Sequence, residues 1–193
     1  MSSGAEPPAA VVLAGGAGTR AGGRDKGLLA WRGEPLVAHA LRRLREAGID
    51  EIVVSANRNA AEYARHGCPV LADAEPGEFR GPLAGISRAL GAVASTRLLT
   101  VPVDVPDWPV ALVPALQDAL VRGAAACSVA RVAGRREPLF ALYPTAVARE
   151  ADAALARGER AVHAFQDRIG CVEVDIAAGP GAFANLNDAE AFA

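Results

Sequence analysis

The sequence predicts an α/β protein in which a mostly parallel β-sheet is covered by helices on both faces, which gives three layers. Short, continuous apolar segments alternate with segments of helical periodicity along the whole chain. Strands that are apolar on both sides belong inside such a sheet, because helices shield each face from water. The 193 residues, of which 51% are hydrophobic, suffice for one core of this kind, and no linker divides them.

The first predicted strand spans 9–15, and a helix over 34–48 follows it. Pro35 near the start of this helix and Gly48 at its end are typical of helix boundaries. In the segment 81–95, apolar side chains recur at spacings of three and four, as on the buried face of a helix. The other predicted strands are 50–56, 69–73, 97–104, 125–132, 137–144 and 171–175. The other predicted helices are 60–67, 109–123, 146–157, 159–168 and a last one from about Asp188.

Net charge and cysteine usage exclude several classes of protein. A net charge of -2 argues against a nucleic-acid binder that works by neutralising phosphates. The three cysteines, Cys68, Cys127 and Cys171, are odd in number and far apart. We therefore expect neither a disulfide framework nor a zinc site, and we expect a reducing cytoplasm as the setting. The first ten residues do not resemble a signal peptide, and no apolar run reaches the roughly 18 residues of a membrane span.

Ligands of open parallel sheets bind beyond the carboxyl ends of the strands. The segment that follows the first strand, 15–27, holds six glycines in thirteen residues, which is too many for the interior of a helix or strand. Its backbone can approach a ligand closely and turn N–H groups towards an anion. Arg20, Arg24 and Lys26 add positive charge to the same segment. The loop therefore predicts a binding site for a nucleoside triphosphate.

Two familiar phosphate loops do not fit this segment. Residues 16–21 match the dinucleotide pattern G-x-G-x-x-G/A, but the glycines and proline that follow prevent an immediate helix, and Asn57 after the second strand is not the required carboxylate. The P-loop pattern fails because Lys26 is preceded by aspartate and followed by glycine.

The loop resembles the signature of the molybdenum cofactor guanylyltransferases. The resemblance rests on Leu13, Ala14, Gly15 and Gly16, then Arg20, then Gly22 and Gly23, then Asp25, Lys26, Gly27 and Leu28. It implies a three-layer, Rossmann-like nucleotidyltransferase fold and a single domain over 1–193, with a nucleotide-binding half at about 9–107 and an acceptor-binding half at about 108–193. It also implies that Leu13, Ala14, Gly15, Gly16 and Lys26 bind the nucleotide, and that Lys26 and Arg20 take part in catalysis. Cytidylyltransferase relatives generally have Ala-Ala-Gly at 14–16, so the double glycine indicates guanine.

Three further residues of the nucleotide-binding half agree with this family. Asn57 ends the second strand and is expected to contact the nucleotide through its amide. Asp73 ends another strand, where a carboxylate can pair with the N1–H and exocyclic amino group of guanine; adenine and cytosine lack that pair of donors. Gly81 opens the segment Gly-Pro-Leu-Ala-Gly, which in the family begins a helix beneath the nucleotide.

Asp104 follows a buried strand, and its carboxylate can hold Mg²⁺ together with substrate phosphates. The family usually has Pro-Cys-Asp here, and this chain has Pro102-Val103-Asp104, so the cysteine is not required for the chemistry. The resemblance implies that Asp104 is also catalytic and contacts the nucleotide. The segment that begins at Arg136 resembles part of the acceptor-binding half. The resemblance implies that Arg160, Asn185 and Asn187 are candidates for acceptor binding.

The resemblance implies that GMP passes from GTP to the phosphate of the molybdenum-molybdopterin cofactor and that pyrophosphate is released, with Mg²⁺ as the metal ion. Cofactor-biosynthesis proteins and apo-molybdoenzymes are then expected as transient partners, with neither nucleic acid nor membrane involved. The nearest rival function is that of a related enzyme which uses CTP or another phosphorylated acceptor. A binding module that holds GTP without turnover is a second rival, and a nicotinamide oxidoreductase is a third.

Overall fold

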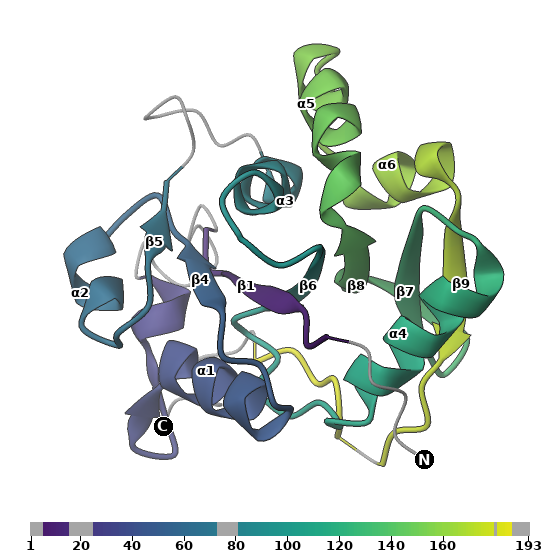
Figure 1. Ribbon diagram of the computed structural model, residues 1–193. Helices are drawn as coiled ribbons and strands as arrows, with labels where there is room; N and C mark the ends of the chain where they lie inside the picture. The colour runs from purple at the N-terminus through teal and green to yellow at the C-terminus, as the bar shows by residue number, and fades with distance from the viewer. Residues whose placement is uncertain (1–5, 16–24, 73–80, 180, 187–193) are drawn as a thin grey trace.

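The computed structural model describes residues 6–15, 25–72, 81–179 and 181–186. Its centre is a seven-stranded sheet with the strand order β5-β4-β1-β6-β8-β7-β9. Helices lie on both sides of this sheet (Figure 1). The predicted three-layer α/β/α class with a mostly parallel sheet is therefore confirmed.

The first half of the sheet is parallel and holds the first strand of the chain at its middle. The strands here are β5 (Val70–Leu71), β4 (Ile52–Ser55), β1 (Ala9–Leu13) and β6 (Arg97–Pro102). In the sheet register, Val11 of β1 pairs with Val53 on one side and with Thr100 on the other. Because these strands run in one direction, the segments that follow them meet at one edge of the sheet.

The second half of the sheet contains one antiparallel strand. The strands are β8 (Arg135–Pro144), β7 (Cys127–Val132) and β9 (Cys171–Asp175). Strand β8 runs antiparallel to both β6 and β7, whereas β9 pairs with β7 in parallel. The register of β7 with β8 shifts between Val129 and Ala130, whose partners on β8 are Ala141 and Glu137.

Successive residues of the central strands point to opposite faces, and each face packs on its own set of helices. Ala10 and Val12 face α1 (Leu36–Glu46), α2 (Ala60–Ala64) and α4 (Leu112–Gly123), whose apolar residues belong to the same core cluster. Ala9 and Val11 face α3 (Pro82–Leu90), α5 (Ala148–Ala156) and α6 (Val162–Ile169). In Figure 1, α3, α5 and α6 lie above the sheet, and α1 and α4 lie below it.

The main departure from the predicted elements lies between the glycine-rich loop and the first helix. The predicted helix over 34–48 begins only at Leu36, because Glu34 and Pro35 form β3 of a hairpin with β2 (Ala30–Trp31). Arg32 and Gly33 turn the hairpin with φ values of 50° and 85°, the left-handed conformations that a tight two-residue turn requires. Short 3-10 helices form at η2 (Lys26–Leu28) and η3 (Thr145–Val147). The helix predicted from Asp188 lies outside the described residues.

The expectation of no disulfide framework did not foresee the one disulfide that the structure contains. Cys127 and Cys171 are partners in the register of β7 and β9, with Cα atoms 4.5 Å apart, and they form a disulfide. Sequence spacing could not reveal this, because 44 residues separate two positions that only the sheet brings together. Cys68 is a buried free thiol, and burial raises its pKa. No helix in the described part of the chain is long and apolar enough to cross a membrane.

Candidate active site

A cavity of about 180 Å³ lies at the carboxyl ends of β1, β4 and β6. It is lined by seven of the residues that the sequence singled out: Leu13, Ala14, Gly15, Lys26, Asn57, Gly81 and Asp104. These residues come from five separate segments of the chain. Four further candidates, Gly16, Arg20, Asp73 and Asn187, lie outside the described residues. The topology of the sheet therefore brings the described nucleotide-site candidates to one place.

Lys26 and Asp104 form an ion pair in this cavity. Lys26 Nζ donates a hydrogen bond to Asp104 Oδ2 at 2.7 Å, and the two side chains are 21% and 20% exposed. Asp104 is held at the end of β6, where the backbone N–H of Val103 donates to the carbonyl of Leu13 at 3.1 Å. Because both charges are partly shielded from water and reach the same cavity, they can act on one bound anion and its counter-ion.

The C-terminal segment places Asn185 beside the same lysine. Lys26 Nζ donates a second hydrogen bond to Asn185 Oδ1 at 3.0 Å. Leu186 N–H donates to the Asp104 carbonyl, and Phe183 N–H donates to the Asp107 carbonyl, each at 2.9 Å. This segment therefore lies along the chain that follows β6. Asn185, a candidate for acceptor binding, here contacts the lysine of the predicted nucleotide site.

Close packing at two glycines shapes the wall formed by α3. Gly81 precedes the helix with φ of 79°, and an added Cβ would lie 3.3 Å from the carbonyl oxygen of Arg160. Arg160, which is predicted to bind the acceptor, thus has its backbone against the wall of the cavity at Gly81. Gly85 packs so closely on β4 that an added Cβ would overlap the Ser55 hydroxyl. The amino end of α3 points its partial positive charge towards this side of the cavity.

Asp25 has two partners that the sequence analysis did not identify. Its carboxylate accepts a hydrogen bond from the Tyr63 hydroxyl at 2.5 Å and one from the Asn59 amide at 3.0 Å. Both partners come from α2 and the residue that precedes it. No local pattern marks Tyr63 as a site residue, because it looks like any apolar position of a short helix.

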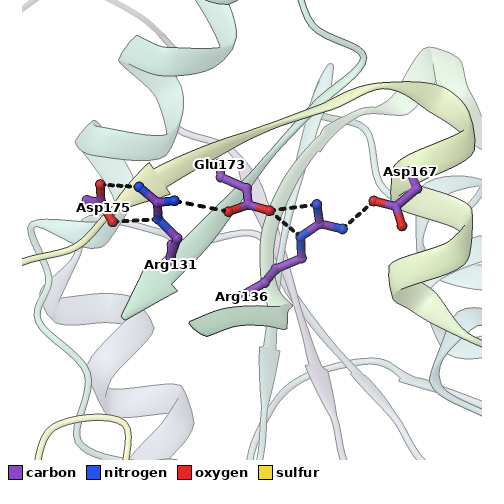
Figure 2. A network of polar contacts seen from close by, with 5 residues as sticks. All are labelled: Arg131, Arg136, Asp167, Glu173 and Asp175. Atoms are coloured by element: carbon purple, nitrogen blue, oxygen red, sulfur yellow. Dashed lines mark hydrogen bonds and ion pairs between the residues drawn. The ribbon is translucent and has the colours of Figure 1, made fainter. Parts of the chain in front are cut away.

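Arg136 is held in a charge network at the other end of the sheet. It pairs with Glu173 at 2.7 Å and with Asp167 at 2.5 Å, while Arg131 binds Asp175 and Glu173 (Figure 2). The hydrogen bond that Arg136 donates to Asp167 raises the pKa of Arg136, and the hydrogen bond that Arg131 donates to Asp175 lowers the pKa of Asp175. These exposed pairs join β7, β8, β9 and α6. They account for the charge of Arg136 without a ligand.

The donor groups at the cavity suit a cation that is shared with a substrate. Among the described residues, no group of three or more His, Cys, Asp or Glu side chains can hold a metal ion. Of the described residues that line the cavity, Asp104 is the one that offers a carboxylate. One carboxylate fits Mg²⁺, because this ion keeps several waters and is completed by substrate phosphates, but it does not fit a metal bound in an all-protein cage.

A model of the MobA-like NTP transferase domain matches residues 10–169, which is most of the chain. The chain belongs to the MobA-like NTP transferase family. A relative from Pseudomonas paraeruginosa, named molybdenum cofactor guanylyltransferase, is 40% identical over 194 residues, which cover 100% of this MobA-like chain and 97% of that protein. The family resemblance predicted from the loop is therefore confirmed.

Two solved structures share the fold of this MobA-like chain. Molybdopterin-guanine dinucleotide biosynthesis protein A from Archaeoglobus fulgidus has a TM-score of 0.77 at 20% identity, covering 95% of this chain and 94% of its own. A Mycobacterium tuberculosis protein in complex with manganese has a TM-score of 0.67 at 19% identity, covering 97% of this chain and 96% of its own. At these identities, the similarity establishes a common fold.

Proposed function

We propose that this chain transfers GMP from GTP to the phosphate of the molybdenum-molybdopterin cofactor, with release of pyrophosphate. The observation that supports this most directly is the Lys26–Asp104 pair, which lies in a cavity lined by the glycine-bearing end of β1. The relative named molybdenum cofactor guanylyltransferase covers the whole chain at 40% identity. The site supports nucleotide binding with charge stabilisation, and the relative supports the choice of GTP and of the acceptor.

The nucleotide would lie with its phosphates towards Lys26 and the end of β1. Gly15 leaves room for a backbone approach, since an added Cβ would meet the Ser55 carbonyl at 3.7 Å and the Asn57 amide at 3.8 Å. Asn57 lines the same cavity and can hydrogen-bond a base edge or a ribose. Lys26 would stabilise the negative charge that builds up on the pyrophosphate as it leaves.

Asp104 would hold a divalent cation, which we propose is Mg²⁺. The manganese complex of the fold relative from Mycobacterium tuberculosis supports a divalent ion in this kind of protein. When bound, the ion would neutralise phosphate charge. The Lys26 ammonium group is hydrogen-bonded to Asp104 Oδ2. A cation that binds to Asp104 would replace this contact, and the ammonium group could then bind phosphate.

The acceptor phosphate needs no strong general base. Its oxygen is already anionic near neutral pH, so the main obstacle is the repulsion between two anions and their alignment. Lys26 and the positive end of α3 reduce that repulsion, and the cavity walls fix the orientation. This agrees with the residues that line the cavity, which include neither a histidine nor a cysteine among the described residues.

We also propose that the chain works as one domain, with the nucleotide bound by about 9–107 and the acceptor by about 108–193. Support comes from the single sheet, which continues from β6 of the first half into β8 of the second. Arg160 lies between α5 and α6, and its backbone packs against Gly81 at the cavity. An acceptor bound by α5 and α6 would therefore lie next to the nucleotide. The chain would bind GTP and the cofactor in the cytoplasm. There it would also contact transient partners that supply or receive the cofactor.

The direct test is turnover of α-labelled GTP in the presence of the molybdenum-molybdopterin cofactor. We expect label in a dinucleotide product and one pyrophosphate released for each transfer. Equal or better turnover of CTP would assign the chain to the cytidylyltransferases instead. GTP binding without pyrophosphate release would show that the chain is a binding module and not a transferase.

A further inference from the structure

Tyr63 holds the end of the glycine-rich loop at the residue that precedes Lys26. Its side chain is fully buried, and its hydroxyl donates to Asp25 Oδ1 at 2.5 Å. Asn59 donates its amide to the other oxygen, Asp25 Oδ2, at 3.0 Å. Both oxygens of this carboxylate are therefore bound by side chains from α2 or the residue that precedes it.

Tyr63 also packs against the residue that follows Lys26. A Cβ added to Gly27 would overlap the Tyr63 hydroxyl and would lie 3.1 Å from the ring atoms Cε1 and Cζ. Gly27 is buried, so an outward shift of residues 25–27 would break this contact. The two neighbours of Lys26 in the chain are thus both fixed by one phenol ring and its hydroxyl.

We propose that Tyr63 is a positioning residue for Lys26, and that it sets the place from which the ammonium group reaches the transferred nucleotide. The backbone at Lys26 is ordered by the short helix η2, in which Leu28 N–H donates to the Asp25 carbonyl and Leu29 N–H to the Lys26 carbonyl, each at 3.1 Å. From there the side chain extends to Asp104. The proposal rests on the proposed role of Lys26 in transfer.

The hydroxyl is the part of Tyr63 that the proposal depends on. Burial, followed by the hydrogen bond to Asp25, raises the pKa of this phenol, so it remains a protonated donor throughout the neutral range. Without the hydroxyl, the Asp25 carboxylate would rely on the exposed amide of Asn59. The backbone before Lys26 would then be free to shift, and transition-state contacts are sensitive to shifts of about 1 Å.

The segment that leads into α2 lines the cavity at Asn57. Asn59 lies two residues after Asn57, which lines the cavity, and it enters α2 in the left-handed conformation with φ of 52°. The anchoring of Asp25 therefore connects the lysine loop to the segment that would contact the base or ribose. A change at Tyr63 would reach Lys26 through its two neighbours in the chain, Asp25 and Gly27, and would reach Asn57 only through the backbone.

The chain offers a matched control, because its only other tyrosine is also fully buried. Tyr143 accepts a hydrogen bond from Gln166 at 2.7 Å and belongs to the core on the opposite face of the sheet. Tyr143→Phe removes the same atom as Tyr63→Phe from a comparably buried environment in that opposite core. Any general effect of deleting a buried hydroxyl should appear in both variants.

The kinetic experiment combines Tyr63→Phe with Lys26→Met. We expect Tyr63→Phe to lower kcat about 10-fold with little change in the KM for GTP, as for a weakened contact made in the transition state. The double variant should be no slower than Lys26→Met alone, because the hydroxyl acts through the lysine. Gly27→Ala, which displaces the loop and keeps the hydroxyl, should behave in the same way.

A spectroscopic readout does not depend on turnover. Lys26 is the only lysine in the sequence, so reductive methylation with ¹³C-formaldehyde labels this side chain and the terminal amine alone. We expect Tyr63→Phe to move the Lys26 methyl signal and Tyr143→Phe to leave it in place.

Additive losses in the double variant, an unmoved methyl signal, or equal effects of the two tyrosine variants on kcat would overturn the positioning role. Full activity of Lys26→Met would instead refute the proposed role of the lysine itself, so the two failures are distinguishable.

Discussion

Lys26 Nζ lies 2.7 Å from Asp104 Oδ2, although 78 residues separate them along the chain. Each side chain is about one-fifth exposed, so the pair is neither a screened surface contact nor a fully buried one. Each charge therefore keeps access to the cavity while its position is restrained by the other. A nucleotide that arrives with a divalent cation offers each of them a new partner of opposite charge.

Lys26→Ala should reduce transfer by more than about 100-fold, which is the usual effect of removing one charge contact from a transition state. The fold should persist, because the side chain ends in a cavity and not in the apolar core. Single-turnover rates and a thermal melt of the same sample check both points. Arg32→Ala is the control, since Arg32 is an exposed cation that lies 3.9 Å from the carboxylate of Asp107. Near-normal turnover of the lysine variant would remove Lys26 from the mechanism.

Asp104→Asn should abolish the dependence of transfer on a divalent cation and reduce its rate to a small remainder. The amide keeps the shape of the side chain but lacks the charge that holds a hard cation. The measurement is the initial rate against magnesium concentration, from none to excess. Asp107→Asn is the matched control, because Asp107 lies three residues further along the same segment and is exposed. A rate that still rises with magnesium as in the unaltered chain would place the ion elsewhere.

The layers and strand ends could be predicted because they depend on local patterns. Continuous apolar segments marked β1, β4 and β6, and the rule for ligands of parallel sheets pointed to their carboxyl ends. The glycine-rich loop pointed to Lys26 as a cation of the site, and the end of a buried strand pointed to Asp104. Their meeting in one cavity follows from the parallel order of β1 and β6.

What the sequence could not show depends on contacts between distant segments. The Cys127–Cys171 disulfide exists because β7 and β9 are neighbours in register, and no spacing rule predicts that register. In the sequence, Tyr63 resembles any apolar residue of a short helix. Only the structure shows the hydrogen bond that its hydroxyl donates to Asp25. The family resemblance alone predicts that Asn185 binds the acceptor, and its contact with Lys26 depends on the path of the C-terminal segment along Asp104.

Reduction of the Cys127–Cys171 disulfide should lower the free energy of unfolding by about 4 kcal/mol if the entropy of a 44-residue loop dominates. The cross-link restrains the unfolded chain and joins edge strand β9 to β7. Denaturant unfolding with and without a reductant measures the difference. Cys68→Ser should leave that difference unchanged, because Cys68 is a free thiol. Peptide mapping that shows both cysteines alkylated without prior reduction would contradict the pairing.

Gly85→Ala should destabilise the fold by about 1–3 kcal/mol, the usual cost of inserting a methyl group into a packed interface. Its Cβ would overlap the Ser55 hydroxyl and lie 3.1 Å from Ser55 Cβ and 3.3 Å from Leu13 Cδ2, so α3 would have to move away from β4 and β1. Gly91→Ala at the end of the same helix is the control, because the nearest atoms there are 3.9 Å away and its φ of -85° suits alanine. Since Leu13, Ser55 and Gly85 all line the cavity, the Gly85 variant should also raise the KM for GTP. Equal melting temperatures of the two variants would show that α3 adapts without cost.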